Sequence, residues 1–117
     1  MIRTIAKSKL HGLRITDTDL HYGGSLTLDA DLMAAADMVP GERVQVVNLN
    51  SGDRLETYLI EGRPGSGECV LNGPAALRGT PGDLVHVISY GLYLDGEDTR
   101  GLPKSIVVDD SNRPVSG

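Results

Sequence analysis

The chain of 117 residues contains no phenylalanine, no tryptophan and a single cysteine, Cys69. One cysteine excludes a disulfide within the chain, and no Cys/His cluster has the spacing of a zinc site, so no metal site is expected. A core without Phe and Trp has to be built from Val, Leu, Ile, Ala and Met, which suits a β-barrel or sandwich. The length allows one core, and we expect residues 1–117 to form a single domain.

The sequence also lacks an excess of positive charge and any long apolar run. With 11 Lys and Arg against 16 Asp and Glu, its net charge is −5. Nucleic acid is therefore not an expected partner, because phosphate binding needs a basic surface. The N-terminal stretch MIRTIAKSKLHG has neither the apolar run of a signal peptide nor the length of a membrane span. We expect a cytoplasmic protein that binds neither nucleic acid nor membranes.

Apolar residues recur mainly at the spacing of β-strands, and Gly- and Pro-rich turns separate the runs. This pattern predicts about seven strands and a mainly β domain. One helix is expected over Ala30–Met38 behind a cap at Asp29, and a short helix or turn over Ala75–Arg78. The tail after Asp110 is expected to be loosely held. The predicted strands are Ile2–Ile5, Leu13–Thr16, Arg43–Leu49, Leu55–Ile60, Cys69–Leu71, Leu84–Leu94 and Ser105–Val108.

Two glycines, Gly23 and Gly24, directly precede Ser25 in the stretch LHYGGSLTLD. An ordinary turn is the simplest interpretation, since small residues cluster in turns. Glycine also tolerates strained φ values, which would let the Ser25 hydroxyl attack the Gly24 carbonyl carbon and turn the peptide into an ester. Loss of the Ser25 α-proton would then leave dehydroalanine, which hydrolyses to a pyruvoyl group. Such a ketone forms a Schiff base with an amine substrate and accepts electrons from it.

Four stretches, the first of which contains Gly24 and Ser25, occur in a fixed order and spacing. They are MIRTIAKSKLHGLRITDTDLHYGGSLTLDADLM, NSGDRLETYLI, GSGECVLNG and PGDLVHVISY. Together they resemble the bacterial, pyruvoyl-dependent aspartate decarboxylase family, which makes β-alanine for pantothenate and coenzyme A. The resemblance runs in register from Met1 to about Tyr90 and weakens through VVDDSNRPV.

The resemblance implies a fold, an assembly and a cofactor. The fold would be a six-stranded double-psi β-barrel with short helices, assembled as a homotetramer with active sites between subunits. Self-cleavage between Gly24 and Ser25 would give a β chain (1–24) and an α chain (25–117). Ser25 would become the covalent pyruvoyl cofactor, and the partner would be a small amino-acid substrate.

The same resemblance assigns roles to residues of the NSGDRLETYLI stretch and to Lys9. Tyr58 would return a proton to the substrate Cα, and Thr57 would support the processing intermediate and line the substrate site. Arg54 would anchor the substrate side-chain carboxylate, with Lys9 as a second cation. Taken alone, Thr57 reads as an ordinary strand residue and the two cations as solvated surface charges. Alternation also puts Thr57 and Tyr58 on opposite faces, so sharing one site would need a bend or a subunit boundary.

Two more groups of residues match the family. His11, His21 and Tyr22 are interpreted as supports for the cleaved segment and the pocket, although packed core histidines are an equal alternative. The loop Asn72, Gly73, Pro74 and Ala75 would face substrate. The family usually has Asn-Gly-Ala-Ala here, and proline removes one backbone N–H and fixes φ. Gly12 and the pair Leu77-Arg78 also depart from the common sequence.

Three functions stay open at this point. The first is pyruvoyl-dependent decarboxylation of L-aspartate to β-alanine and carbon dioxide. The second is the same chemistry on a related acidic amino acid in a specialised pathway, which Pro74 alone supports. The third is a homologue that is never cleaved and acts as a binding module.

Overall fold

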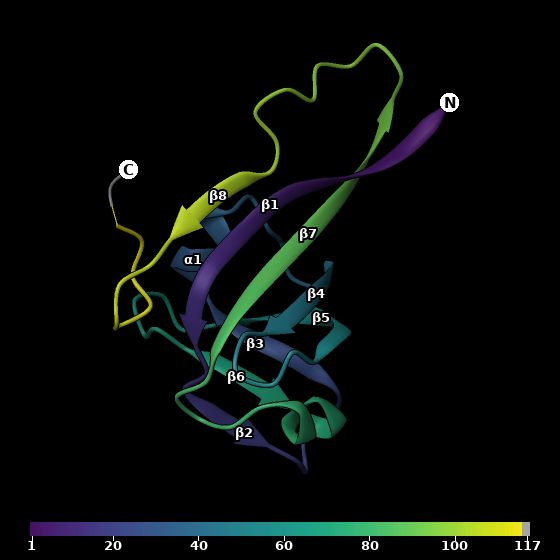
Figure 1. The fold of residues 1–117 in the computed structure, drawn as a ribbon. Coiled ribbons are helices and arrows are strands. Elements are labelled where there is room, and N and C mark those ends of the chain that lie inside the picture. Colours follow the sequence, from purple (N-terminus) through teal and green to yellow (C-terminus); the bar gives the residue numbers. More distant parts are fainter. Residues whose placement is uncertain (116–117) are drawn as a thin grey trace.

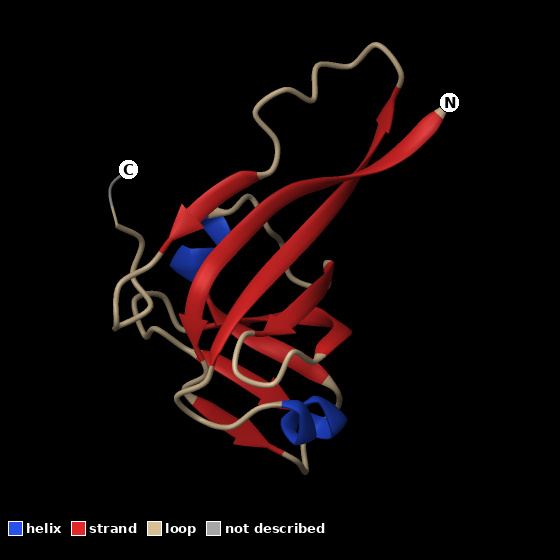
Figure 2. Cartoon of the chain, viewed as in Figure 1, coloured by secondary structure: helices blue, strands red, loops and turns tan. Residues whose placement is uncertain are grey.

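A computed structural model describes residues 1–115, and eight strands form one mixed sheet in it (Figures 1 and 2). The prediction of a mainly β fold is confirmed. In sheet order the strands run β2-β6-β3-β5-β4-β7-β1-β8, so the short strands β2 and β8 lie at the ends and six lie between them. The strands are β1 (Ile2–Arg14), β2 (Asp17–Asp19), β3 (Ser25–Asp29), β4 (Arg43–Asn48), β5 (Arg54–Gly62), β6 (Cys69–Asn72), β7 (Leu84–Leu94) and β8 (Lys104–Val107).

The two ends of this strand order are joined by the chain that links β1 to β2. The Thr16 N–H donates to the Cys69 carbonyl of β6 at 2.9 Å, and the Cys69 N–H donates back to the Thr16 hydroxyl at 3.0 Å. The chain leaving β1 is thereby hydrogen-bonded to a strand at the opposite end of the order. The sheet wraps around on itself and encloses one core.

That core consists of small aliphatic side chains, as the composition predicts. Leu10, Leu26 and Val87 are fully buried in it, and so is Cys69. Burial raises the pKa of the Cys69 thiol to about 12, so this cysteine stays protonated and unreactive at neutral pH.

Strands β1 and β7 extend beyond the rest of the sheet as a two-stranded arm (Figure 1). Ile2 at the start of β1 pairs with Leu94 at the end of β7. Ile2, Leu92 and Leu94 are exposed on this arm. An arm with exposed apolar side chains is a surface that a partner would cover.

Strand β1 is a single strand where the apolar pattern predicts two. The segment between them carries the polar residues Lys7, Ser8 and Lys9, which hide the continuity. Ser8 is buried nonetheless, because its hydroxyl lies 2.8 Å from that of Ser89 on β7. A buried polar pair that satisfies itself needs no apolar pattern.

Both helices differ in extent from the prediction. Helix α1 spans Ala30–Ala35 and stops before Asp37, whose φ of +55° leaves the helical region. The second element, η1, is a 3₁₀ helix over Gly73–Arg78 with Pro74 in its first turn. Neither helix of residues 1–115 is long and apolar enough to cross a membrane.

The segment after Asp110 is held more firmly than predicted. Asn112 is buried, and its amide donates to the carbonyls of Arg14 and Gly67 at 2.8 and 2.9 Å. Val108 and Pro114 form an isolated bridge. One buried asparagine ties this segment to the barrel, a contact that a polar sequence does not reveal. Residues 116–117 lie outside the described part.

Candidate active site

Ser25 is the first residue of β3 and is completely buried. It pairs with Asn72 on β6. The Asn72 side-chain amide donates to the Ser25 hydroxyl oxygen at 2.9 Å, and to the Thr27 hydroxyl at the same distance. The Ser25 hydroxyl in turn donates to the Gly23 carbonyl at 3.3 Å. Two hydrogen bonds thus fix the Ser25 oxygen beside the Gly24-Ser25 peptide.

Gly73 presses directly against the backbone that precedes Ser25. Its φ is +64°, and a Cβ added there would lie 2.8 Å from the Gly24 nitrogen, 2.9 Å from the Gly24 Cα and 2.7 Å from the Tyr22 carbonyl oxygen. No side chain fits at that distance from backbone atoms. Pro74 continues this contact, since its Cδ lies 3.8 Å from where a Gly24 Cβ would be. The start of η1 therefore supports the Gly24-Ser25 bond.

An open pocket of about 550 Å³ lies beside Gly24. Strand β5 forms one wall and η1 forms the other. Six residues singled out from the sequence line it together: Gly24, Arg54, Thr57, Tyr58, Pro74 and Ala75. The pocket brings together residues from three separate stretches of the sequence.

Thr57 and Tyr58 reach this pocket without the bend or subunit boundary expected for them. They pair with Val44 and Arg43 in an uninterrupted β4–β5 register. Thr57 is half-buried, whereas Tyr58 is 46% exposed. Alternation holds as predicted, and both residues still line the pocket. The pocket is therefore wide enough to reach both faces of β5.

Arg54 brings an unneutralised positive charge to the pocket. Its guanidinium donates to the side-chain oxygen of Gln45 at 2.7 Å, and the Tyr90 hydroxyl donates to the same oxygen at 2.7 Å. Within residues 1–115, no carboxylate forms an ion pair with Arg54. A cation held by neutral groups stays available to a substrate carboxylate.

Sequence reasoning missed two residues of this region. Arg78, the last residue of η1, lines the pocket, but its position was noted only as a departure from the family. Thr27 shares the Asn72 amide with Ser25. Its signal was its position two residues after Ser25, which places both on one face of a strand.

Lys9 and His11 are not among the residues that line this pocket. A row of paired residues crosses the sheet from Lys9 on β1 to Ile88 on β7, then to Gln45 on β4 and finally to Glu56 on β5. Three strand spacings separate Lys9 from β5, roughly 14 Å along the sheet. Within a single chain the structure does not bring Lys9 to Arg54.

His11 lies instead against His86 of β7, with ring centroids 4.1 Å apart. The Gly12 N–H donates to Nδ1 of His86 at 3.0 Å, so this nitrogen carries no proton. Burial lowers the pKa of His86, and the charges of His11 and Lys9 lower it further. Lys9, His11 and His86 form a separate polar group on the outside of β1 and β7.

His21 and Tyr22 lie in the exposed turn that leads to Gly23. The His21 N–H donates to the Asp19 carboxylate at 3.2 Å. Neither side chain lines the pocket, and Tyr22 meets Gly73 through its backbone carbonyl. In residues 1–115, no three His, Cys, Asp or Glu side chains are grouped so that they could hold a metal ion.

Comparisons with known proteins agree with this geometry. The model of the aspartate decarboxylase family matches residues 1–115. The chain is 46% identical over 115 residues to an aspartate 1-decarboxylase of Shouchella clausii (strain KSM-K16), covering 98% of this chain and 91% of the relative. The crystal structure of a rationally designed double-psi β-barrel protein, mkDPBB_sym_86, superposes with a TM-score of 0.50 at 17% identity, over 66% of this chain and 90% of that one. The fold is thus a double-psi β-barrel, and the chain belongs to the aspartate decarboxylase family.

Proposed function

We propose that this protein decarboxylates L-aspartate to β-alanine and carbon dioxide, in the supply of pantothenate and coenzyme A. It does so with a pyruvoyl group made from its own Ser25. The observation that carries the proposal is the buried Ser25 hydroxyl, which Asn72 holds beside a pocket containing Arg54. Membership of the aspartate decarboxylase family supports it.

The first stage is cleavage between Gly24 and Ser25. The Ser25 oxygen bonds to the Gly24 carbonyl carbon while the C–N bond breaks, so the Ser25 nitrogen becomes a free amine. Removal of the Ser25 α-proton then expels the Gly24 carboxylate, and water replaces the nitrogen of the remaining dehydroalanine as ammonia. The products are a β chain (1–24) and an α chain (25–117) that begins with the ketone.

Three residues of this chain fit that stage. Asn72 orients the Ser25 oxygen through its 2.9 Å hydrogen bond. Gly73, because it has no side chain, lets the Gly24 backbone pack directly against it. Thr57 lines the pocket with Gly24, and its hydroxyl would donate a hydrogen bond to the oxygen that becomes charged during attack.

The second stage uses residues on β5. Once formed, the pyruvoyl group would supply an electrophilic carbonyl for the substrate amine and an acceptor for the electrons released with carbon dioxide. Arg54 binds a substrate carboxylate, and Tyr58 donates a proton to the substrate Cα. On the side formed by β6 and η1, Ala75 lines the pocket, whereas Asn72 and Gly73 are buried beside Ser25 and Gly24.

The working form is proposed to be a homotetramer in the cytoplasm, with active sites between subunits. Lys9 and His11 do not line the pocket of their own chain, so the roles that the resemblance implies for them would be at the pocket of a neighbouring subunit. The exposed apolar arm of β1 and β7 supplies a surface for such an assembly.

Pro74 favours a second candidate, decarboxylation of a related acidic amino acid. It lacks a backbone N–H and lies against Gly24, so one donor to a substrate carboxylate is missing. The assay therefore offers aspartate, glutamate and cysteic acid in parallel, with Ser25→Ala as the inactive control. Release of β-alanine from aspartate at the highest kcat/KM supports the proposal. A preference for another acid overturns the substrate, and tight binding by a chain that is never cleaved would favour the binding module.

A further inference from the structure

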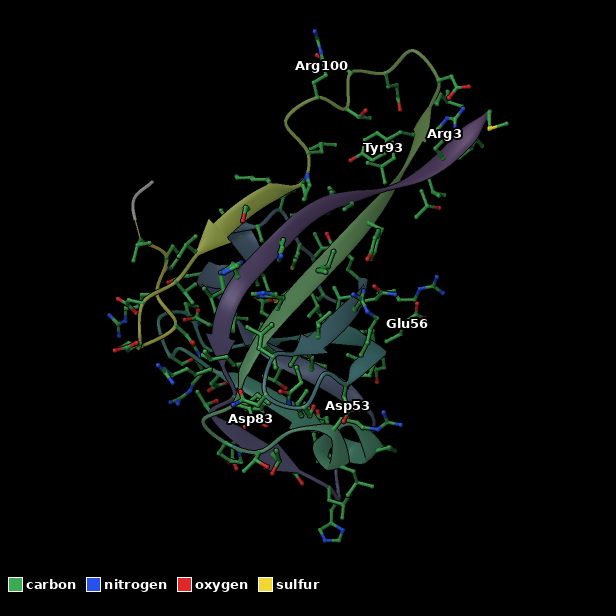
Figure 3. All side chains as sticks on the ribbon, in the orientation of Figure 1. Arg3, Asp53, Glu56, Asp83, Tyr93 and Arg100 are labelled. Atoms are coloured by element: carbon green, nitrogen blue, oxygen red, sulfur yellow. The ribbon has the colours of Figure 1, made fainter. Side chains whose placement is uncertain are left out.

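The backbones of Arg54 and Arg78 both lie at the end of the pocket that is distant from Ser25. Strands β3 and β5 are parallel, with Leu26 beside Leu59, so Ser25 lies next to Tyr58. Arg54 precedes Tyr58 by four residues, roughly 13 Å along the strand. Arg78 closes η1, whose other end touches Gly24, and its guanidinium lies 3.7 Å from the carboxylate of Asp53, the residue before Arg54. Figure 3 shows Asp53 beside η1 and Glu56 farther along β5.

The charges at this end leave both arginines able to bind an anion, Arg78 by exchanging a weak ion pair. Among residues 1–115, the hydrogen-bond partner of the Arg54 guanidinium is the neutral Gln45. The Arg78–Asp53 pair is long, and both side chains are largely exposed, so it is weak. The one acidic side chain that lines the pocket, Glu56, lies 4.0 Å from Arg43.

We propose that Arg78 is a specificity-determining residue that binds the substrate side-chain carboxylate together with Arg54. This inference rests on the proposed function. The substrate amine has to reach residue 25, so the carboxylate at the other end of the molecule points toward the two arginines. Lys9 is then not needed as the second cation within the chain.

The geometry also suits the chemistry of carbon dioxide loss. The α-carboxylate loses its charge in the reaction, and a cation paired with it would stabilise the ground state more than the transition state. The side-chain carboxylate keeps its charge throughout. Two guanidinium groups on that carboxylate improve substrate binding without slowing the chemical step.

The test compares steady-state kinetics of the self-cleaved wild type with those of Arg78→Leu. The expected result is a KM for aspartate raised about tenfold with kcat changed by less than about twofold. This pattern is typical of losing an interaction that binds substrate and transition state equally. Arg78→Lys should recover part of the loss. Arg63→Leu is the matched control, because Arg63 is also paired with an acid, Glu68, but is 85% exposed and outside the pocket.

A merely structural role for Arg78 would give a different pattern. If Arg78 only holds Asp53, then Asp53→Asn should raise KM as Arg78→Leu does, and this result would overturn the proposal. If Arg78 binds substrate, Asp53→Asn removes a competing carboxylate and does not raise KM. An unaltered KM in Arg78→Leu overturns the proposal as well.

A binding measurement separates this inference from the proposed function. Succinate, a dicarboxylate without an amine, is titrated calorimetrically into wild type and Arg78→Leu, whatever their state of cleavage. Affinity weakened about tenfold by the substitution supports the two-arginine site, and equal affinity overturns it. A wild type that binds succinate but never releases β-alanine would reject the proposed function alone.

Discussion

The side-chain amide nitrogen of Asn72 lies 2.9 Å from the Ser25 hydroxyl and 2.9 Å from the Thr27 hydroxyl. One buried amide thus fixes two hydroxyls on the same face of β3. The residue proposed to attack the chain is held in place from the neighbouring strand, and the glycine that follows Asn72 supports the bond to be broken.

Asn72→Ala should slow self-cleavage at least tenfold, because the Ser25 oxygen loses its only side-chain donor among residues 1–115. Leaving buried hydroxyls without this partner should also lower the free energy of unfolding by about 1–3 kcal/mol. The cleaved fraction is followed over time by gel electrophoresis. Thr27→Val is the matched control, since it keeps the bond between Asn72 and Ser25. Cleavage of Asn72→Ala at the wild-type rate would remove Asn72 from the mechanism.

Gly73→Ala should abolish cleavage and lower the melting temperature, because the new methyl group would lie under 3 Å from Gly24 backbone atoms. Gly52→Ala provides the comparison: Gly52 has a φ of +79° but open space around it. Backbone strain alone should cost about 1 kcal/mol there, with cleavage unchanged. Equal effects of the two substitutions on cleavage would show that the contact with Gly24 is unimportant.

Tyr58→Phe should be cleaved normally but turn over aspartate slowly, because it removes the proposed proton donor after the pyruvoyl group has formed. General acid catalysis typically contributes roughly 10²–10⁴-fold, so kcat should fall by at least a hundredfold. The purified self-cleaved protein, with both of its chains, is assayed for β-alanine release. A kcat near that of wild type would assign the proton transfer to another group.

Pro74→Ala tests whether proline limits substrate binding. The substitution restores a backbone N–H beside Gly24, so the KM for aspartate should fall several-fold if that donor faces the carboxylate. Stability should drop by about 0.4–1 kcal/mol, because proline no longer restricts the unfolded chain. A KM that stays the same or rises would show that Pro74 is neutral for specificity.

Asp29→Ala tests a carboxylate that stabilises the fold and lies outside the pocket. Burial alone would raise the pKa of Asp29, but backbone N–H groups of Gly67, Asp31 and Gly65 donate to it and lower its pKa overall. A folded pKa below the ordinary 3.8 means that this stabilisation is complete above 3.8 and is lost as the pH falls through the folded value.

The substitution should therefore cost about 2 kcal/mol at pH 7 and less in acid. Thermal melts at pH 7 and near pH 3 measure the difference, with the exposed Asp31→Ala as control. If the difference in stability between Asp29→Ala and wild type is as large near pH 3 as at pH 7, the ionised Asp29 carboxylate is not the stabilising group.

Part of this structure can be predicted from the sequence, and the features that cannot be predicted have physical reasons. Alternation predicts β4 and β5 closely, because their inner faces are apolar and their outer faces polar. It misses the continuity of β1, where the pair Ser8 and Ser89 replaces an apolar contact. It also misses the burial of Asn112, whose partners Arg14 and Gly67 are distant in the sequence.

The candidate site shows the same division. Motif resemblance identifies Arg54, Thr57 and Tyr58, which line one pocket, and Ser25, which is buried directly after the pocket residue Gly24. Arg78 was not predicted, because its place beside Asp53 depends on how η1 packs against β5. The resemblance implies that Lys9 is a second cation beside Arg54, yet β7 and β4 separate the two residues within one chain.

The central claim is that Ser25 becomes the catalytic ketone, and the intact mass of the purified wild-type protein tests it most directly. After prolonged warming, the account predicts two chains, residues 1–24 and 25–117. The larger should be lighter by one ammonia than a chain beginning with serine. A single uncut chain, or a larger fragment that retains an N-terminal serine, would contradict it.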